Sequence, residues 1–267
     1  MSPTVHAHRM AIHPTAIIDP DADVSLEAEI GPYCIIGSGV TIGARTRLMA
    51  HVYMEGKLTV GKDNLFYPYS SCGVAPQDKK YKGEPSETRI GDGNTIREFV
   101  TIHRGTEGGG MLTSIGDGNL LMAYVHIAHD VLIGNRTILA NGVTFAGHVI
   151  VDDYANIGGL CAIHQFCRIG RYAMVGSYSV IKQNVLPYSV TASDHEPQIY
   201  GANRIGMERH GYSAGDIEPL QNAFRILTRS NLNTSQALSR IQEEIPQTTE
   251  ISELLDFIRC SARGFVK

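Results

Sequence analysis

The sequence has no tryptophan, and aromatic residues make up only 7% of its 267 residues, so few large rings are available to fill a core. It has no run of more than two Lys or Arg residues and a net charge of −4, which argues against a general nucleic-acid binder. No apolar stretch approaches the roughly 20 residues that span a bilayer, and the polar segment 1–10 lacks the apolar region of a secretory signal. We therefore expect a globular protein located in the cytoplasm.

An apolar residue recurs at every sixth position through the first two thirds of the chain. The repeat runs through eleven successive positions from Ile12 to Cys72, resumes at residues 90–102, and continues through twelve positions from Ile115 to Ile181. A six-residue unit fits a short strand followed by a corner, and three such units make one triangular coil. Such coils stack as parallel strands about 4.8 Å apart. The sequence therefore predicts a mainly β protein built as a hexapeptide parallel β-helix.

Four of the five cysteines fit this repeat better than they fit a disulfide framework or a zinc ribbon. The number of cysteines is odd, and no pair has the CxxC spacing. We call the repeated apolar position i, and in most units the residue at i+4 is small or β-branched. Cys72 takes an i position, and Cys34, Cys161 and Cys167 take i+4 positions. We interpret these four as small buried hydrophobic residues.

Two polar segments, residues 73–89 and 103–114, interrupt the repeat. Insertions in solenoids loop out from one face and often carry binding groups. The repeat stops after Pro187. We therefore predict a β-helical domain over residues 1–190 with these two inserted loops, and a small α-helical domain over residues 191–267 that covers the open end of the coil.

The C-terminal segment has the 3.6-residue period of amphipathic helices. Ser213 and Asp216 form a capping box ahead of the first predicted helix. Thr234 is the predicted N-cap of a second helix, which Pro246 ends, and a third helix is predicted around residues 251–258.

Three histidines share nearly one side of the predicted coil. His148 follows His129 by close to the length of one coil, and His164 follows His148 by close to the length of another. None of them occupies an inward i or i+4 position. Three interpretations remain open: scattered surface histidines, a zinc site such as β-helical carbonic anhydrases build, and a histidine general base oriented by the adjacent Asp130.

Several motifs in the same order resemble the UDP-N-acetylglucosamine O-acyltransferase family. They are QDKKYKGEP (Gln77–Pro85), TIHRGT (Thr101–Thr106), NLLMAYVHIAHD (Asn119–Asp130), LANGVTFAGH (Leu139–His148) and AIHQFC (Ala162–Cys167). Members of this family have left-handed coils and associate as homotrimers, with substrate grooves between neighbouring coils. They transfer a 3-hydroxyacyl group from acyl carrier protein to the 3-hydroxyl of UDP-N-acetylglucosamine, the first step of lipid A synthesis.

The resemblance implies a set of catalytic roles. His129 matches the general base, Asp130 the carboxylate that orients it, and Gly147 the backbone donor that stabilises the oxyanion. It implies no metal, no other cofactor and no covalent acyl-enzyme.

The resemblance also implies binding roles, assigned position by position. His126, His148, His164 and Gln165 match groups around the sugar and the acyl hydroxyl. The first inserted loop supplies Gln77, Asp78 and Lys80 near the diphosphate, and the nucleotide end is contacted by His195, Asn203 and Arg209.

Two positions depart from the family pattern. Ser177 stands at the position associated with acyl-chain length, where glycine is frequent, and we expect it to favour a shorter chain. Ile205 stands where the family typically has glutamate, and the segment 195–203 is one residue longer than usual.

The related N-acyltransferases carry an N-terminal uridine-binding domain, for which a repeat beginning at Ile12 leaves no room. A coenzyme A-dependent acetyltransferase and a non-enzymatic scaffold remain as further alternatives.

Overall fold

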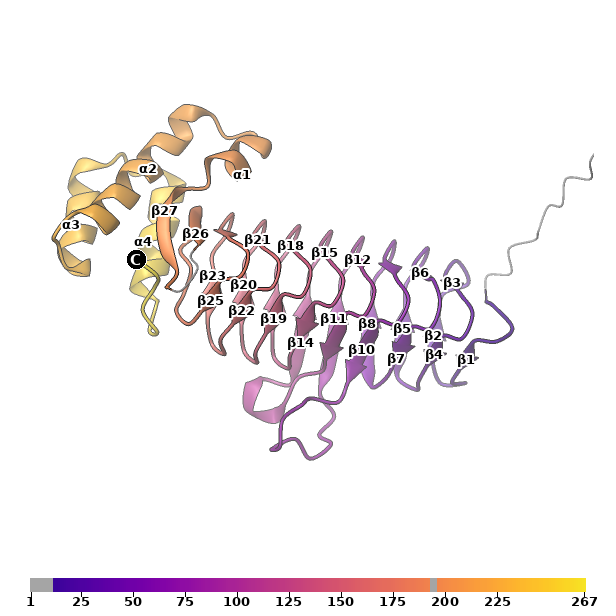
Figure 1. The fold of residues 1–267 in the computed structure, drawn as a ribbon. Coiled ribbons are helices and arrows are strands. Elements are labelled where there is room, and N and C mark those ends of the chain that lie inside the picture. The colour runs from indigo at the N-terminus through magenta and orange to yellow at the C-terminus, as the bar shows by residue number, and fades with distance from the viewer. Residues whose placement is uncertain (1–11, 193–195) are drawn as a thin grey trace, which may run out of the picture.

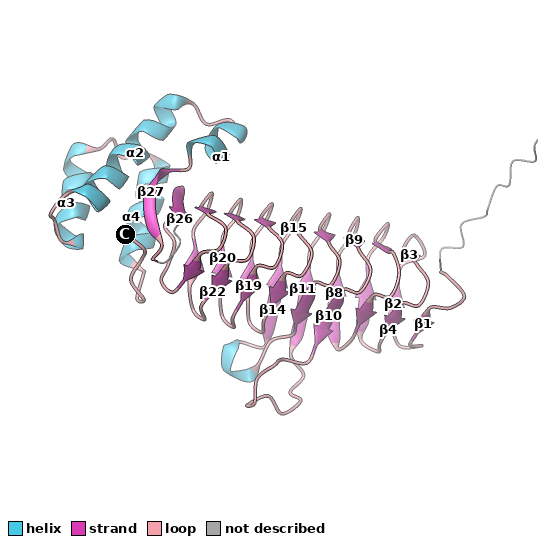
Figure 2. Cartoon of the chain, in the orientation of Figure 1, coloured by secondary structure: helices cyan, strands magenta, loops and turns pink. Residues whose placement is uncertain are grey.

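Short parallel strands wind into a long triangular coil, with a cluster of helices at its C-terminal end (Figure 1). The computed structural model describes residues 12–192 and 196–267. Within these residues the strands form three sheets, one on each side of the coil, and successive strands pass from one sheet to the next (Figure 2).

The three sheets are numbered by their first strands. Sheet 1 contains β1 (Ile17–Ile18), β4 (Ile35–Ile36), β7 (Tyr53–Met54), β10 (Ser71–Val74), β13 (Thr101–His103), β16 (His126–Ile127), β19 (Thr144–Phe145), β22 (Ala162–Ile163) and β25 (Val180–Ile181). Sheet 2 contains β2 (Asp23–Val24), β5 (Val40–Ile42), β8 (Lys57–Val60), β11 (Glu87–Ile90), β14 (Leu112–Ile115), β17 (Leu132–Ile133), β20 (Ile150–Val151) and β23 (Arg168–Ile169). Sheet 3 contains β3 (Glu29–Ile30), β6 (Arg47–Leu48), β9 (Leu65–Phe66), β12 (Thr95–Ile96), β15 (Leu120–Leu121), β18 (Ile138–Leu139), β21 (Asn156–Ile157), β24 (Met174–Val175), β26 (Ser189–Ala192) and, antiparallel to the rest, β27 (Gln198–Ala202).

The strand register confirms that three six-residue units make one coil. Ile17 pairs with Ile35, and Ile127 pairs with Phe145 one coil further on. Where the two insertions interrupt the repeat, the paired residues are further apart in the sequence, as in Ser71 with Thr101 and Thr101 with His126. The chain leaves the coil at each insertion and returns in register, so the inward and outward faces of the strands are preserved.

The interior of the coil is filled by the predicted apolar positions. From Ile30 to Ile181, every residue at position i is at most 4% exposed. Cys34, Cys72, Cys161 and Cys167 are buried free thiols, as predicted. Burial raises the pKa of each of them.

One interior corner carries a polar ladder. Asn64, Asn94 and Asn119 are each 1% exposed and stack on successive coils. Asn94 Nδ2 donates to Asn64 Oδ1 at 3.0 Å, and Asn119 Nδ2 donates to Asn94 Oδ1 at 3.0 Å. The buried amides therefore satisfy one another along the coil axis.

The corners of the coil impose a left-handed backbone on residues at i+3. Asp130 and His148 have φ values of 59° and 63°, and Phe166 has 64°. This conformation costs an L-residue roughly 1–2 kcal/mol. Ladder hydrogen bonds hold it in place, as the backbone amide of His148 donates to the carbonyl of His129 at 3.1 Å.

Four helices and a short 3₁₀ turn complete the described chain: η1 (Glu107–Gly109), α1 (Arg204–Arg209), α2 (Ala214–Arg229), α3 (Thr234–Glu244) and α4 (Thr249–Arg259). The predicted capping box of Ser213 and Asp216 is present. The predicted cap of the second helix is wrong by one residue, because Asn233 accepts from the backbone of Gln236 and Thr234 lies inside the helix. The short helix α1 was not predicted.

The helices lie against the last coils. Tyr188 donates its hydroxyl to Glu253 of α4 at 2.5 Å, and the Arg168 guanidinium of β23 lies 4.8 Å from the ring centre of Phe257. The boundary near residue 190 between two domains stays a prediction. Among the described helices, none has the length and apolar character needed to cross a membrane.

Candidate active site

A pocket of about 570 Å³ lies along sheet 1, at the side where its strands turn toward sheet 2. Its lining comes from β16, β19, β22 and β25, from the corners that follow them, from the end of β13 and from the first insertion. The lining residues are Gln77, His103, His126, Ala128, His129, Thr144, Phe145, Ala146, Gly147, Ala162, Ile163, His164, Gln165, Val180 and Lys182.

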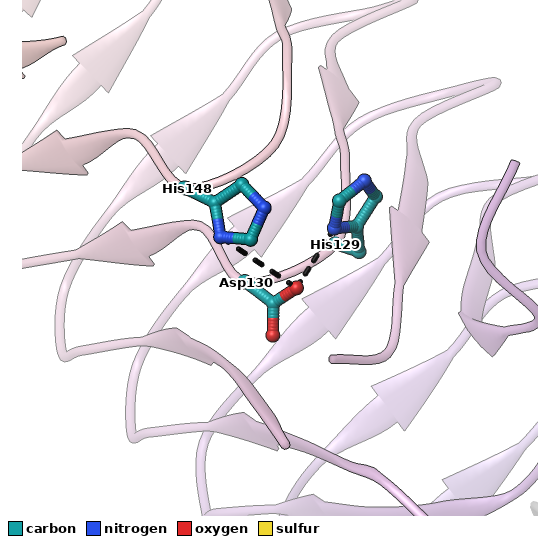
Figure 3. A group of neighbouring side chains, drawn as sticks. All are labelled: His129, Asp130 and His148. Carbon is teal, nitrogen blue, oxygen red and sulfur yellow. Dashed lines mark hydrogen bonds and ion pairs between the residues drawn. The ribbon is translucent and has the colours of Figure 1, made fainter. Parts of the chain in front are cut away.

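His129 and Asp130 form a hydrogen-bonded pair at the wall of this pocket (Figure 3). His129 Nδ1 lies 2.7 Å from Asp130 Oδ2. The carboxylate is fully buried and the imidazole side chain is 16% exposed. A carboxylate accepts only, so Nδ1 carries the proton and Nε2 is left with a free lone pair. This tautomer is the one that can take a proton from a substrate.

His148 lies on the other side of the same carboxylate (Figure 3). Its Nδ1 is 3.9 Å from Asp130 Oδ2, beyond hydrogen-bond range. Its ring stands edge-on to His129 at 5.0 Å and is stacked on Phe166 at 4.5 Å. Burial lowers the pKa of His148, against the opposing effect of the Asp130 charge. His148 is therefore a neutral, packed ring near pH 7.

Two further imidazoles line the pocket beside His129. His126 Nδ1 is 2.7 Å from Thr101 Oγ1, and burial lowers the pKa of His126, with a smaller effect from His129. His103 is 3% exposed, meets His126 edge to face at 4.8 Å, and its pKa is lowered to about 4, mainly by burial. His103 was not among the predicted site residues. Its occurrence in the TIHRGT motif, at the start of the second insertion, was the signal that could have identified it.

Gly147 lies directly against the His129 ring. A Cβ added at Gly147 would stand 2.5 Å from His129 Cε1 and 2.8 Å from Nε2, so any side chain there would force the ring to move. Gly147 is buried, and no acceptor for its backbone N–H is found among the described residues. The corner geometry explains this, because the amide at i+2 points out of the ladder. A free N–H beside the histidine is the donor that an oxyanion needs.

His129, Asp130 and His148 also offer three ligand atoms within 4.8 Å of one another, an arrangement that could hold a metal ion. The Asp130 oxygens already accept hydrogen bonds from His129 Nδ1, from the Thr106 backbone at 2.8 Å and from Thr106 Oγ1 at 2.5 Å. Oδ2, the oxygen nearest both histidines, already accepts two of these bonds, so a metal ion bound there would have to displace a donor. The contacts therefore favour a hydrogen-bonded acid–base arrangement over a metal centre.

The residues predicted in the first insertion differ in how close they lie to this site. Gln77 lines the pocket, and the charge of Asp78 acts on the pKa of His148. Lys80 is an exposed residue whose backbone N–H donates to Asp78 Oδ1 at 2.9 Å.

The residues predicted for the nucleotide end lie elsewhere in the chain. Asn203 and Arg209 line a different pocket of about 590 Å³, between sheet 3 and α1, together with Ile205. Asn203 is the N-cap of α1, and its Nδ2 donates to the carbonyl of Tyr172 at 2.8 Å. His195 lies outside the described residues. Within one chain, the predicted nucleotide end and the histidine pocket are therefore separate sites.

His164 and Gln165 line the far part of the histidine pocket, where both are exposed. His164 Nδ1 lies 3.3 Å from Arg263 Nη2, so the end of the chain reaches this wall. Ser177 is exposed at the corner between sheets 3 and 1, on the same corner as Gly159, whose carbonyl accepts from the backbone of Tyr178 at 2.9 Å. Ser177 is not a lining residue of the histidine pocket, and its effect on chain length stays a prediction.

The repeats match a family model described as bacterial transferase hexapeptide (six repeats), over residues 112–147. With the triangular coil and the histidine pocket, this match defines a hexapeptide-repeat transferase. The predicted parallel β-helix, with the left-handed coils that the resemblance implied, is confirmed.

Closer comparisons narrow the class. Residues 184–266 match the family model described as Udp N-acetylglucosamine O-acyltransferase; Domain 2. The chain is 50% identical over 256 residues to acyl-[acyl-carrier-protein]–UDP-N-acetylglucosamine O-acyltransferase of Thermodesulfovibrio yellowstonii, covering 96% of this chain and 99% of that protein. Among solved structures, LpxA from Acinetobacter baumannii is 43% identical with a TM-score of 0.92, over 97% of this chain and 100% of that one. LpxA from Bacteroides fragilis, a UDP-N-acetylglucosamine acyltransferase, is 40% identical with a TM-score of 0.93, over 96% and 100%.

The chain belongs to the UDP-N-acetylglucosamine O-acyltransferase family. The resemblance drawn from its motifs is thereby confirmed.

Proposed function

We propose that the protein transfers a 3-hydroxyacyl group from acyl carrier protein to the 3-hydroxyl of UDP-N-acetylglucosamine, the first step of lipid A biosynthesis, with His129 as general base. The observation that carries this proposal is the His129–Asp130 pair, whose Nδ1–Oδ2 bond of 2.7 Å leaves Nε2 free at a pocket of about 570 Å³. The cytoplasmic location expected from the sequence goes with this acyl donor.

The reaction needs one proton carrier and one oxyanion donor. His129 Nε2 takes the proton of the sugar hydroxyl as that oxygen attacks the thioester carbonyl. The Gly147 N–H stabilises the negative charge that develops on the carbonyl oxygen. When the C–S bond breaks, the imidazolium returns its proton to the leaving thiolate, so the C–O bond formed and the C–S bond broken balance without an acyl-enzyme. Asp130 stabilises the imidazolium through Nδ1.

The remaining polar residues bind the substrates in this proposal. His126, His148, His164 and Gln165 surround the sugar and the acyl hydroxyl. Gln77, Asp78 and Lys80 approach the diphosphate from the first insertion, and His195, Asn203 and Arg209 hold the nucleotide end. Desolvated neutral histidines suit the first of these tasks, because burial lowers the pKa of His126 and His148 and leaves them uncharged next to the base.

We further propose that the active assembly is a homotrimer in which one chain supplies the histidine pocket and its neighbour supplies the nucleotide end. Two observations support this. The Asn203–Arg209 pocket is separate from the histidine pocket within a single chain. The corner between sheets 3 and 1 also carries an exposed aromatic column, in which Tyr33, Tyr69, Phe99 and Tyr124 are 43–62% exposed. These rings and His51 stack at 5.0–5.1 Å, an apolar edge that a second copy would cover.

A mass-spectrometric assay tests the activity. The purified protein is incubated with UDP-N-acetylglucosamine and a series of 3-hydroxyacyl carrier proteins, beside His129→Ala. We expect an acylated nucleotide sugar from the wild type and a loss of about 10²–10⁴-fold in the variant, the usual contribution of a general base. Unreduced turnover in a folded His129→Ala variant would remove the base assignment.

Light scattering and complementation test the assembly. We expect the mass of three chains in solution. Hybrids that mix His129→Ala chains with Arg209→Ala chains should regain part of the activity, because some interfaces then combine an intact histidine pocket with an intact Arg209. A monomer, or hybrids no more active than the two separate variants, would contradict the shared site.

A zinc site at His129, Asp130 and His148 is the second candidate, since their ligand atoms lie within 4.8 Å. Metal analysis of the purified protein and assay after treatment with a chelator separate the two. The general-base proposal expects activity that the chelator leaves unchanged, whereas one zinc per chain and inactivation by the chelator would favour the metal site.

A further inference from the structure

The second insertion contacts the catalytic carboxylate directly. We propose that Thr106 and Gly109, in the turn 106–110, are positioning residues that keep Asp130 paired with His129 rather than with His148. This inference rests on the proposed role of His129 as general base, and it assigns the insertion a task in catalysis rather than in substrate binding.

Thr106 makes two of the hydrogen bonds that the carboxylate accepts. Its backbone N–H donates to Asp130 Oδ1 at 2.8 Å, and its hydroxyl donates to Oδ2 at 2.5 Å. Thr106 is 5% exposed and the Asp130 side chain is fully buried. Buried charge needs such donors, because water cannot solvate it there. Asp130 is thus held from one side by Thr106 and from the other by His129.

The main chain of Asp130 is fixed by the same insertion. Its backbone N–H donates to Thr113 Oγ1 at 2.8 Å. Thr113 belongs to β14, which follows the η1 turn, whereas Thr106 precedes that turn. The insertion therefore holds Asp130 by amide and carboxylate together, while its backbone keeps a φ of 59°.

Gly109 closes the turn over the carboxylate. A Cβ at Gly109 would overlap the Cγ and both oxygens of Asp130, so only glycine permits this approach. The adjacent Gly108 has nothing within 4 Å of the corresponding position. The close contact is therefore specific to Gly109 and is not a property of the glycine-rich turn as a whole.

The fixed position of the Asp130 carboxylate matters because two histidines lie near it. Asp130 Oδ2 lies 2.7 Å from His129 Nδ1 and 3.9 Å from His148 Nδ1. A carboxylate free to rotate could exchange one partner for the other. Because the Thr106 hydroxyl and backbone N–H bind both oxygens, rotation toward His148 breaks two hydrogen bonds. The turn thereby selects which histidine becomes the base.

Replacing Thr106 by valine tests the hydroxyl with little change of shape. Hydrogen bonds to charged groups are strong enough that we expect kcat to fall about 10- to 100-fold in Thr106→Val. KM should stay within about twofold, because Thr106 is buried against the carboxylate and does not line the histidine pocket. Thr106→Ser restores the donor and should recover most of kcat.

Thr88→Val is the matched control. Thr88 is a fully buried threonine of β11, a strand that pairs with β14, and its hydroxyl has no hydrogen-bond partner among the described residues. Removing this hydroxyl should leave kcat and KM unchanged. Gly109→Ala and Gly108→Ala form a second matched pair, in which we expect the first to lower kcat at least 10-fold and the second to leave it within twofold.

The NMR signal of the His129 Nδ1 proton gives a readout independent of turnover. A proton shared with a buried carboxylate resonates far downfield, and it should broaden or shift in Thr106→Val and Gly109→Ala but not in Thr88→Val or Gly108→Ala. Unchanged kcat in folded Thr106→Val, or a loss that Thr106→Ser fails to recover, overturns the inference. If the wild type is inactive or His129→Ala retains full turnover, the proposed function itself fails; if only the Thr106 and Gly109 variants behave as wild type, the inference alone fails.

Discussion

Gly147→Ala isolates the position of the His129 ring from every other feature of the site. The substitution adds one methyl group and keeps the backbone N–H that we assign to the oxyanion. The added Cβ would stand 2.5 Å from His129 Cε1, 2.8 Å from Nε2 and 3.0 Å from Nδ1. Carbon atoms in contact lie about 3.5–4.0 Å apart, so the ring has to move by about 1 Å.

The ring has little room to move without losing its partner. Its Nδ1 is held by Asp130 at 2.7 Å, and its ring lies edge to face with that of His148 at 5.0 Å. A displacement of about 1 Å at a reacting group can cost about 10²-fold in rate, and we expect kcat of Gly147→Ala to fall by about this factor. The fold should survive, because the clash is with the end of a side chain and not with the backbone.

Steady-state kinetics in the mass-spectrometric assay measure this effect, with thermal unfolding to show that the variant is folded. Gly37→Ala is the control, since a Cβ there would meet its nearest neighbours at 3.4–3.6 Å, an ordinary contact distance. A kcat of folded Gly147→Ala within threefold of wild type would refute the assignment of His129 Nε2 as the base at this position.

Three further predictions concern stability and specificity. The pKa of His103 is lowered by burial to about 4, so the unfolded chain binds the extra proton between about pH 6.5 and pH 4, and stability falls as the pH drops through that range. Denaturant unfolding should show that, between pH 7 and pH 5, the free energy of unfolding of the wild type falls by about 2 kcal/mol more than that of His103→Phe. An equal fall in both proteins would contradict this. Asn94→Ala removes the middle of the buried ladder and leaves donors of Asn119 without their acceptor. We expect its free energy of unfolding to fall by about 2–4 kcal/mol in the same assay. The control Asn141→Ala, at an exposed asparagine, should change it hardly at all. Ser177→Gly removes a hydroxymethyl group from the corner beside Gly159 and should shift the preferred acyl chain to greater length; an unchanged chain-length profile would show that Ser177 does not limit the groove.

The hexapeptide repeat was sufficient to predict the coil, because each unit repeats the same local requirement. An apolar residue every sixth position must point inward, and the observed burial of every such residue from Ile30 to Ile181 follows from that requirement. The coil in turn predicts that His129 and His148 come together although they lie on successive coils, and their rings are 5.0 Å apart.

The helical segment was predicted less completely. The box of Ser213 and Asp216 joins residues that are close in the sequence, so the sequence shows it. The cap is Asn233, which forms a capping box with Gln236; Thr234 has Ala237 at the corresponding position and could not form one, so the error lay in overlooking a local signal. The short helix α1 spans only Arg204–Arg209, too short for a periodic pattern.

The order of the amino acids was enough to predict the coil and the histidine column, because both depend on a strict period. Adjacency made the pairing of His129 with Asp130 one of three interpretations, and the structure shows that pairing. The folded molecule was needed to show that Thr106 and Gly109 close over the carboxylate, that His103 joins the pocket, and that Arg209 lies in a different pocket of the chain. These contacts join insertions and helices to the coil, where no repeat relates the partners. The geometry of these contacts depends on the path of each insertion and on the coil residues that it packs against.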